Sequence, residues 1–315
     1  MTRLTLKVYP ARPILAYNVT FNLDNILANV LDDLEGTAME KDSLAHGARV
    51  LAAWQNFSTA PDALSSVFFA SAGKASPGKG TGLLSVAGEF RVEGCTVEEA
   101  RKELIGILKS YWLDLLPPPL NAPLIVDVDH DELTIPGDDD IRQPLLVIGE
   151  VSAAEAATLA ALIVPMPVLN QWKIKNKFTF RSLTAEELAP AFEYLRNNVP
   201  GGDPATSAGY LNPWLVGGKS NRIDPESAVM PVRECAVMWI HAGAQWSDQA
   251  VESQALAFVD GLWKALEFDP DSKTALYGCS DIQLGSHLPR RRTSATFRRI
   301  GAAAARSTST TSWIS

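Results

Sequence analysis

The order of the strands and helices that the sequence predicts favours an α+β fold, with one large antiparallel sheet covered by helices. The first observation is that apolar residues alternate over several short segments, which include two hairpin-like pairs of strands. The second is that helical segments fall between the strands without a regular strand–helix–strand rhythm. The chain has 315 residues, of which 46% are hydrophobic. This is enough for a sizeable core in one large domain or two small ones.

Strands are predicted where apolar side chains recur at every second residue. Residues 4–8 form the first, in which Leu and Val alternate with Thr and Lys until Pro10 ends the pattern. A second strand places four large side chains on one face, namely Leu15, Tyr17, Val19 and Phe21. Four further strands are expected, at 67–69, 86–92, 178–181 and 237–241. The Gly-, Ser- and Lys-rich segment that follows residue 69 is expected to be a loop.

Helix starts are marked by capping boxes, in which a Ser or Thr and a Glu three residues later bond the free N–H groups of the first turn. Three such pairs occur, namely Thr96 with Glu99, Ser152 with Glu155, and Thr184 with Glu187. After Thr96, apolar residues repeat at helical spacing up to Tyr111. Two further helical segments are predicted, one at 25–56 that ends near Trp54 and one at 247–267.

Charge is distributed unevenly along the chain, whose formal net charge is -8. Residues 286–315 hold six of the 28 Lys and Arg residues and none of the 36 Asp and Glu residues, so residues 1–285 carry a net charge of -14. An acidic body disfavours binding to nucleic acid or to anionic membranes, because both require clustered positive charge. We therefore expect neither as a partner. The longest apolar stretch, 153–169, contains one Glu and two Pro residues and predicts no membrane span.

Several short motifs come close to known ligand sites but lack an essential residue. Residues 73–80 (GKASPGKG) lack the Ser or Thr that a phosphate-binding P-loop needs after its Lys, and we interpret them as a hairpin loop. The acidic stretch 127–140 lacks the Gly of a calcium loop, and we interpret it as a solvated loop. The four His residues are too scattered to predict a metal site, and the three Cys residues are interpreted as buried thiols.

Five groups of short segments occur in an order typical of one group of flavoproteins. They are TRLTLKVYP at 2–10; AWQNF at 53–57 with APDAL at 60–64; GEF at 88–90 with GCTVEEA at 94–100; GGKSNRI at 217–223 with PVR at 231–233 and Trp246; and YGCSD at 277–281 with Leu284 and Gly285. Together they resemble the C-terminal half of FAD-linked oxidases of the berberine bridge enzyme-like group, whose FAD domain is of the vanillyl-alcohol-oxidase (PCMH) type. The resemblance spans nearly all of residues 1–285.

The resemblance implies part of an FAD-dependent oxidoreductase. Such an enzyme oxidises a small organic substrate, a sugar or a secondary metabolite, by hydride transfer to FAD, with O₂ as the acceptor. Residues 1–10 would be a remnant of the FAD-binding domain, and 11–285 the substrate-binding domain. Residues 286–315 would be a disordered basic tail, which a frameshift would explain, since the family's C-terminal segment is missing there. The chain is then expected to lack the main FAD domain, to hold FAD weakly and to be inactive alone.

Candidate site residues come from two late segments. On the predicted strand 237–241, Trp239 and His241 lie on one face and are the expected substrate pocket. His241 is the catalytic candidate because the ordinary pKa of His lies near neutrality, and a buried, hydrogen-bonded His is the structural alternative. By resemblance, Tyr277 begins the flavin-facing signature and is a catalytic and cofactor-binding candidate. Cys279 stands where the family places an Asn against the flavin, and is a second cofactor-binding candidate.

The sequence also departs from the family at its expected acid and leaves a second function open. Arg222 stands where plant members have a Glu base. Together with the missing Asn, this favours the alternative of a non-catalytic ligand-binding or scaffold domain derived from such an oxidase. Asn176 and Lys177 are expected to face the same cleft as His241. The N-terminal residues do not have the pattern of a secretory leader.

Overall fold

A computed structural model describes residues 14–28, 36–61, 64–73, 84–128, 143–151, 171–201, 207–216 and 237–266. Eight strands in this part of the chain form one sheet in the order β4-β5-β1-β3-β2-β7-β8-β6. Their bounds are Ile14–Phe21 (β1), Val67–Ser71 (β2), Leu84–Arg91 (β3), Leu124–Val128 (β4), Leu145–Val151 (β5), Gln171–Thr179 (β6), Ser207–Leu215 (β7) and Met238–Trp246 (β8). All neighbouring strands are antiparallel except β4 and β5, which are parallel.

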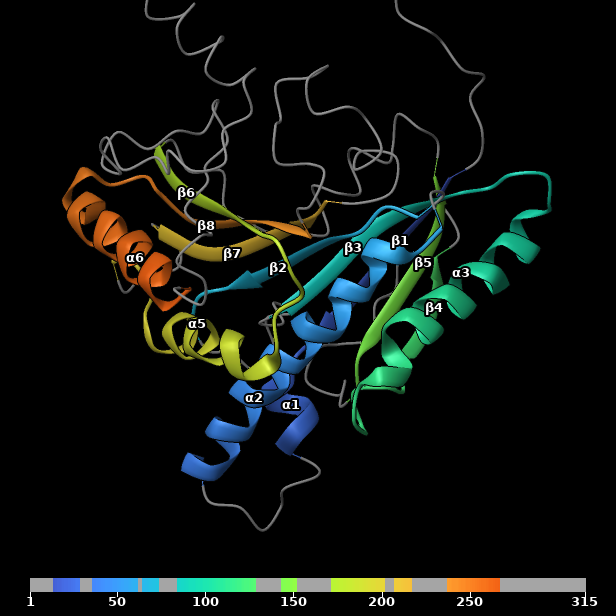
Figure 1. Ribbon diagram of the computed structural model, residues 1–315, viewed down its shortest axis with the longest axis horizontal. Helices are drawn as coiled ribbons and strands as arrows, with labels where there is room; N and C mark the ends of the chain where they lie inside the picture. The colour runs from blue at the N-terminus through green and yellow to red at the C-terminus, as the bar shows by residue number, and fades with distance from the viewer. Residues whose placement is uncertain are drawn as a thin grey trace, which may run out of the picture.

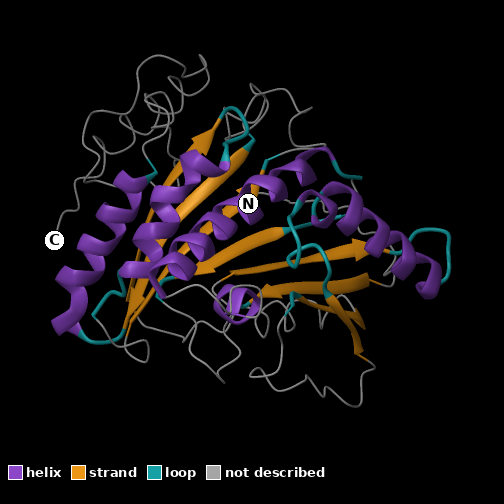
Figure 2. Ribbon diagram, turned by 90° about the horizontal axis from the view of Figure 1, so that it is seen from below, coloured by secondary structure: helices purple, strands orange, loops and turns teal. Residues whose placement is uncertain are grey.

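Helices cover one face of this sheet. The four longer helices are Gly36–Trp54 (α2), Val97–Tyr111 (α3), Ala185–Asn197 (α5) and Glu252–Ala265 (α6). Figures 1 and 2 show them side by side on the same side of the strands. A short helix, Leu23–Ala28 (α1), packs on α2. The predicted α+β class is therefore confirmed, with a sheet that is mixed at one edge.

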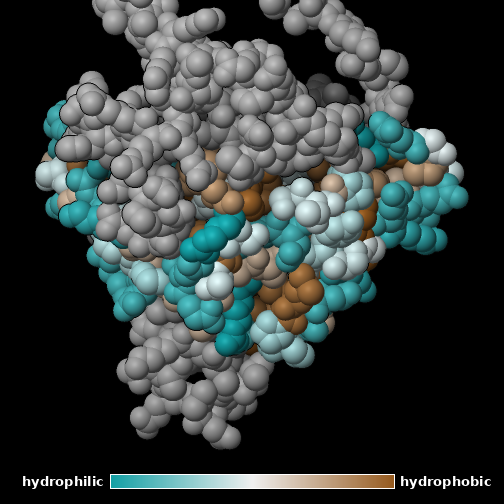
Figure 3. Space-filling model, in the orientation of Figure 1, coloured by the Kyte–Doolittle hydropathy of each residue, from teal (hydrophilic) through white to brown (hydrophobic). Residues whose placement is uncertain are grey.

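The core lies between the helices and the sheet because each layer is amphipathic. Leu15, Tyr17, Val19 and Phe21 are all buried on the helix side of β1, as their alternation predicts. Trp112, which ends α3, packs edge-to-face on Phe21, with ring centroids 5.4 Å apart. Polar residues occupy the outer sides of the helices. The side of the molecule seen in Figure 3 is hydrophilic over much of its described surface, with apolar residues toward its middle.

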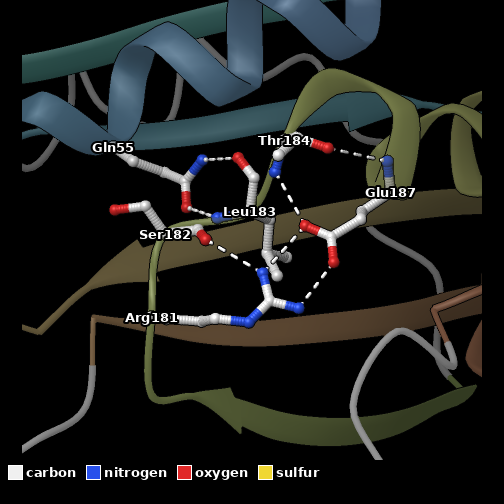
Figure 4. Close-up of polar contacts among 6 residues, drawn as sticks. All are labelled: Gln55, Arg181, Ser182, Leu183, Thr184 and Glu187. Atoms are coloured by element: carbon white, nitrogen blue, oxygen red, sulfur yellow. Dashed lines mark hydrogen bonds and ion pairs between the residues drawn. The ribbon is translucent and has the colours of Figure 1, made fainter.

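The capping boxes predicted at Thr96 and Thr184 start α3 and α5. In each, the threonine hydroxyl accepts a bond from the N–H of the Glu three residues on, and that Glu carboxylate accepts one from the threonine N–H. The Glu187 carboxylate also forms an ion pair with Arg181, in which the closest nitrogen–oxygen distance is 2.5 Å (Figure 4). These bonds lower the pKa of Glu187 to about 2.

The structure corrects several predicted elements. The strand expected at 178–181 runs instead from Gln171 to Thr179, and three strands, β4, β5 and β7, were not predicted. The helical segment 25–56 is two helices, with residues 29–35 outside the described part, followed by the 3₁₀ helix η1 (Gln55–Thr59). The strand at 4–8, the capping box at Ser152, the Gly-rich loop after residue 73 and the tail at 286–315 also lie outside the described residues.

Candidate functional site

The candidate site is on the face of the sheet that the described helices leave uncovered. We call it the helix-free face and define it on the four strands β6, β8, β7 and β2, where every second residue belongs to it. The strand register assigns to it Trp172, Ile174, Asn176 and Phe178 of β6; Trp239, His241, Gly243 and Gln245 of β8; Ala208, Tyr210, Asn212 and Trp214 of β7; and Val67, Phe69 and Ser71 of β2. No Asp, Glu, Lys or Arg is among these described residues.

His241 lies at the centre of this face, on the middle one of three adjacent strands. Its register partner on β6 is Asn176, and its register partner on β7 is Asn212. Directly opposed residues of an antiparallel pair project from the same face at about 5 Å. The three side chains therefore form a row across the sheet, with the imidazole between two amides.

Two tryptophans contact His241, and each is tied to one of these amides. The Trp239 ring lies edge-on to the imidazole, with centroids 4.1 Å apart, and its Nε1 donates to Asn176 Oδ1 at 3.1 Å. The Trp214 ring lies 6.3 Å from the imidazole, and its Nε1 donates to Asn212 Oδ1 at 2.6 Å. The Asn212 amide is itself fixed, because its Nδ2 donates to the carbonyl of Phe68 at 2.7 Å. The two indoles therefore hold the imidazole in a defined position.

One nitrogen of the imidazole lacks a partner in the described part of the chain. His241 Nε2 is buried and has no hydrogen-bond partner among the described residues. Burial disfavours the charged form, and it lowers the pKa of His241 from 6.5 to about 4. The side chain is therefore neutral at pH 7, with one nitrogen that donates and one that accepts. A buried polar atom without a partner is uncommon in a folded protein, and it marks a place where a ligand atom can bind.

Aromatic rings line both sides of this row. Phe178 stacks on Trp239, with ring planes 10° apart, and both belong to a small apolar cluster with Val216. On the other side, Phe69 stacks on Tyr210, with centroids 5.5 Å apart. The Tyr210 ring lies over Gly243, where any side chain would collide with it. Burial raises the pKa of Tyr210 to about 12, so this phenol is also neutral.

The structure brings together only some of the residues expected at the site. Trp239 and His241 are in contact, and Asn176 is beside them, as expected. Tyr277 and Cys279 lie outside the described residues, as do Arg222 and the other residues of the late segments up to 236.

Lys177 is on the opposite face, which corrects the expectation that it shares the cleft with Asn176. Its Nζ donates to the carbonyls of Leu266 at 3.0 Å and Trp263 at 3.4 Å, and lies 4.0 Å from the centre of the Trp263 ring. It thus caps the C-terminal end of α6, where the helix dipole favours a cation. The physical reason is the alternation of β6, which sends neighbouring residues to opposite faces.

Asn212 and Trp214 are the site residues that sequence reasoning missed. They lie on β7, a strand that contains Pro213 and was therefore not recognised, because Pro is disfavoured inside sheets. The available signal was the alternation of Tyr210, Asn212 and Trp214, which is a strand pattern.

The described part of the chain was compared with the requirements of a metal site and of a membrane-spanning helix. It contains no group of three His, Cys, Asp or Glu residues that would hold a metal ion. None of the helices described is long and apolar enough to span a membrane.

Comparison with known proteins identifies this arrangement of strands and helices. No protein-family model and no curated protein sequence matches the chain. Solved structures do. Aclacinomycin oxidoreductase matches 87% of this chain with a TM-score of 0.56 at 13% identity. A glycopeptide hexose oxidase complexed with teicoplanin matches 87% with a TM-score of 0.54 at 17% identity. BBE-like number 28 from Arabidopsis thaliana matches 89% with a TM-score of 0.54 at 12% identity.

The chain has the fold of about half of each of these solved oxidases. The resemblance that the sequence predicts, to oxidases of the berberine bridge enzyme-like group, is confirmed by these structural neighbours. The chain spans about half the length of the solved oxidases, since it covers 47%, 47% and 48% of the three chains named above. At these identities, the similarity shows that the chain shares the fold of the matched half of the oxidases. The chemistry of the chain depends on its own residues.

Proposed function

We propose that this chain is the substrate-binding half of an FAD-dependent oxidoreductase, and that its helix-free face holds a small organic substrate next to His241. The observation that carries the proposal is the buried, unpaired Nε2 of a neutral His241, fixed between two tryptophans in a fold shared with FAD-linked oxidases. Such a group has the position and the charge state of a general base.

The described residues fit one part of FAD and not another. The uncharged rings and amides of the helix-free face fit a planar heteroaromatic ring, and Trp239 and Asn212 are the residues that would contact it. The free N–H groups of a helix start bind a pyrophosphate where no negative charge is present. The first turns of α3, α5 and α6 carry Glu residues, so none of these three fits a pyrophosphate. We propose that this part of FAD is held outside the described residues.

FAD, when bound, would supply the hydride acceptor for oxidation of the substrate. The contribution of this chain is to orient the substrate, to exclude water and to take a proton. A substrate hydroxyl bonded to His241 loses its proton to the imidazole as the carbon–hydrogen bond breaks. The low pKa of His241 keeps the imidazole unprotonated at neutral pH, and it also makes the imidazole a weaker base than a His of ordinary pKa.

Three finer parts of the proposal follow from the resemblance. The substrate is a sugar or a secondary metabolite, O₂ is the acceptor, and the chain alone is inactive because it holds FAD weakly. Two structural neighbours support a small-molecule substrate, since one was solved in complex with teicoplanin and the other with pregilvocarcin.

The test is anaerobic reduction of added FAD, followed by its visible absorbance, with a panel of sugars and aromatic alcohols. The purified chain should contain little flavin and should not reduce it. Together with an FAD-binding partner polypeptide it should reduce flavin, and His241→Phe should slow the reduction by about 100-fold or more, the range of general base catalysis. The matched control, Lys102→Ala on the exposed side of α3, should not. If ligands bind but no flavin is reduced in any combination, the non-catalytic ligand-binding function is the correct one.

A further inference from the structure

Charge is strictly segregated between the two faces of the three strands around His241. β7 (SAGYLNPWL) and β8 (MWIHAGAQW) contain no charged residue at all. β6 contains three, Lys173, Lys175 and Lys177, and by alternation all three belong to the face under α6. Lys175 there pairs with Asp260 of α6 at 2.5 Å, and Lys177 caps the end of that helix. The cations of β6 therefore stabilise the helix layer and do not reach the His241 side.

A ligand on the helix-free face consequently meets rings, amides and a neutral imidazole, and no formal charge from the described residues. Transfer of a carboxylate or phosphate from water to such a surface has a large desolvation cost, and the described residues of this face supply no opposite charge to offset it. An ammonium group also has a desolvation cost, and the described residues of this face include no carboxylate that would offset it. The surface thus discriminates between ligands by charge.

The unpaired atom specifies one functional group on the ligand. In a neutral imidazole, Nε2 is either the donor or the acceptor, depending on the tautomer. A hydroxyl group can donate and accept, and therefore satisfies Nε2 in either case. A ketone or an ether can only accept, and satisfies it in one case alone.

Trp214 adds a second contact beside His241. Its side chain is 43% exposed although its indole nitrogen is tied to Asn212 at 2.6 Å. A ring held in this way is fixed in direction while part of it stays accessible. Fixed aromatic surfaces bind ring compounds at little entropic cost.

We infer that the helix-free face selects uncharged ring compounds that present a hydroxyl to His241 Nε2 and pack against Trp214, and that it rejects the corresponding acids and amines. This inference rests on the site of the proposed function and names its class of ligand. It concerns binding, and it requires no flavin chemistry.

The experiment is ligand-observed saturation-transfer NMR at pH 7 on the purified chain without FAD. The probes are matched sets that differ in charge, namely benzyl alcohol, benzoate and benzylamine, and glucose, glucuronate and glucosamine. The neutral alcohol of at least one set should bind, and its charged analogues should bind at least about tenfold more weakly. Anisole, which is neutral but has no hydroxyl, should bind more weakly than benzyl alcohol.

Two variants identify the contact. His241→Phe keeps a neutral ring but removes the hydrogen bond, and should weaken alcohol binding about tenfold. His241→Gln keeps a neutral group that both donates and accepts, and should retain most of the affinity. Near-UV circular dichroism verifies that both variants are folded.

Equal binding of alcohols and acids would overturn the inference, as would unchanged alcohol binding by the folded His241→Phe variant or no binding of any neutral probe. Selective alcohol binding without flavin reduction in the previous experiment supports this inference and refutes the oxidoreductase proposal. Flavin reduction in the previous experiment, together with equal binding of acids and alcohols, does the opposite.

Discussion

Gln55 and Leu183 are joined by two hydrogen bonds although they are 128 residues apart in the chain. The side-chain amide of Gln55 donates to the Leu183 carbonyl, and the Leu183 N–H donates to Gln55 Oε1, both at 2.8 Å (Figure 4). Gln55 is 2% exposed. It therefore takes the place of a strand residue and connects the end of α2 to the turn between β6 and α5.

Replacement of this side chain should reveal the strength of the connection. Gln55→Met keeps the volume but leaves the buried N–H and C=O of Leu183 unpaired, which should lower the free energy of unfolding by about 2–3 kcal/mol. The control is the neighbouring exposed residue Asn56. Asn56→Ala should change the free energy of unfolding by less than about 0.5 kcal/mol. Urea unfolding measures both. Equal effects of the two substitutions would contradict the role assigned to Gln55.

Asn176 and Lys177 should behave differently because they belong to opposite faces of β6. Asn176→Leu removes the acceptor of Trp239 Nε1, loosens the ring that shields His241 and admits water, so the pKa of His241 should rise toward its ordinary value. Lys177→Met alters only the end of α6 and should leave the pKa of His241 unchanged. NMR titration of the imidazole measures the pKa of His241 in both variants. A change of this pKa in Lys177→Met would contradict the assignment of Lys177 to the face opposite His241.

Acid should destabilise the protein through His241. The unfolded chain has the ordinary His pKa of 6.5, and the folded protein has a value of about 4. Between these values the unfolded state binds more protons, so the contribution of His241 to stability is complete above pH 6.5 and is lost as the pH falls toward about 4. The Gln side chain in His241→Gln does not titrate, so the free energy of unfolding of this variant should depend less steeply on pH over this interval. Parallel pH profiles of the two proteins in urea unfolding would refute the low pKa.

Two glycines should respond in opposite directions to the same substitution. At Gly209 on β7 a methyl group would collide with the ring of Phe258 on α6, so Gly209→Ala should destabilise the protein by about 1–3 kcal/mol. At Gly106, within α3, nothing lies within 4 Å of the added carbon. Gly106→Ala should therefore stabilise the protein by about 0.5–1 kcal/mol, because alanine loses less backbone entropy in a helix. Differential scanning calorimetry measures both changes, and stabilisation by Gly209→Ala would show that α6 does not pack closely on β7.

Much of the fold could be predicted from local patterns. The alternation from Leu15 to Phe21 placed β1 and its buried face, and the capping boxes at Thr96 and Thr184 placed the starts of two helices. These signals are local, because they depend on side-chain period and on the first turn of a helix. The strand β7 was missed because Pro213 is an adverse local signal that tertiary packing overrides.

The site could be predicted only in part, for a different reason. Trp239 and His241 are two residues apart on one strand, so their common face follows from the sequence. The pairing of His241 with Asn176 and Asn212 depends on the register of three strands that lie far apart in the chain, which no local pattern specifies.

The sequence by itself determined the α+β class, the positions of the capped helices and the resemblance to FAD-linked oxidases. All of these depend on patterns of residues that are close together in the chain. The tertiary structure decided which face of β6 each residue belongs to and where Lys177 binds. It also decided that His241 is neutral and that its Nε2 has no partner among the described residues. These depend on the order of β7, β8 and β6 in the sheet and on the position of α6 over one face of it. Burial, and with it the pKa of the imidazole, arises only when those distant segments pack together.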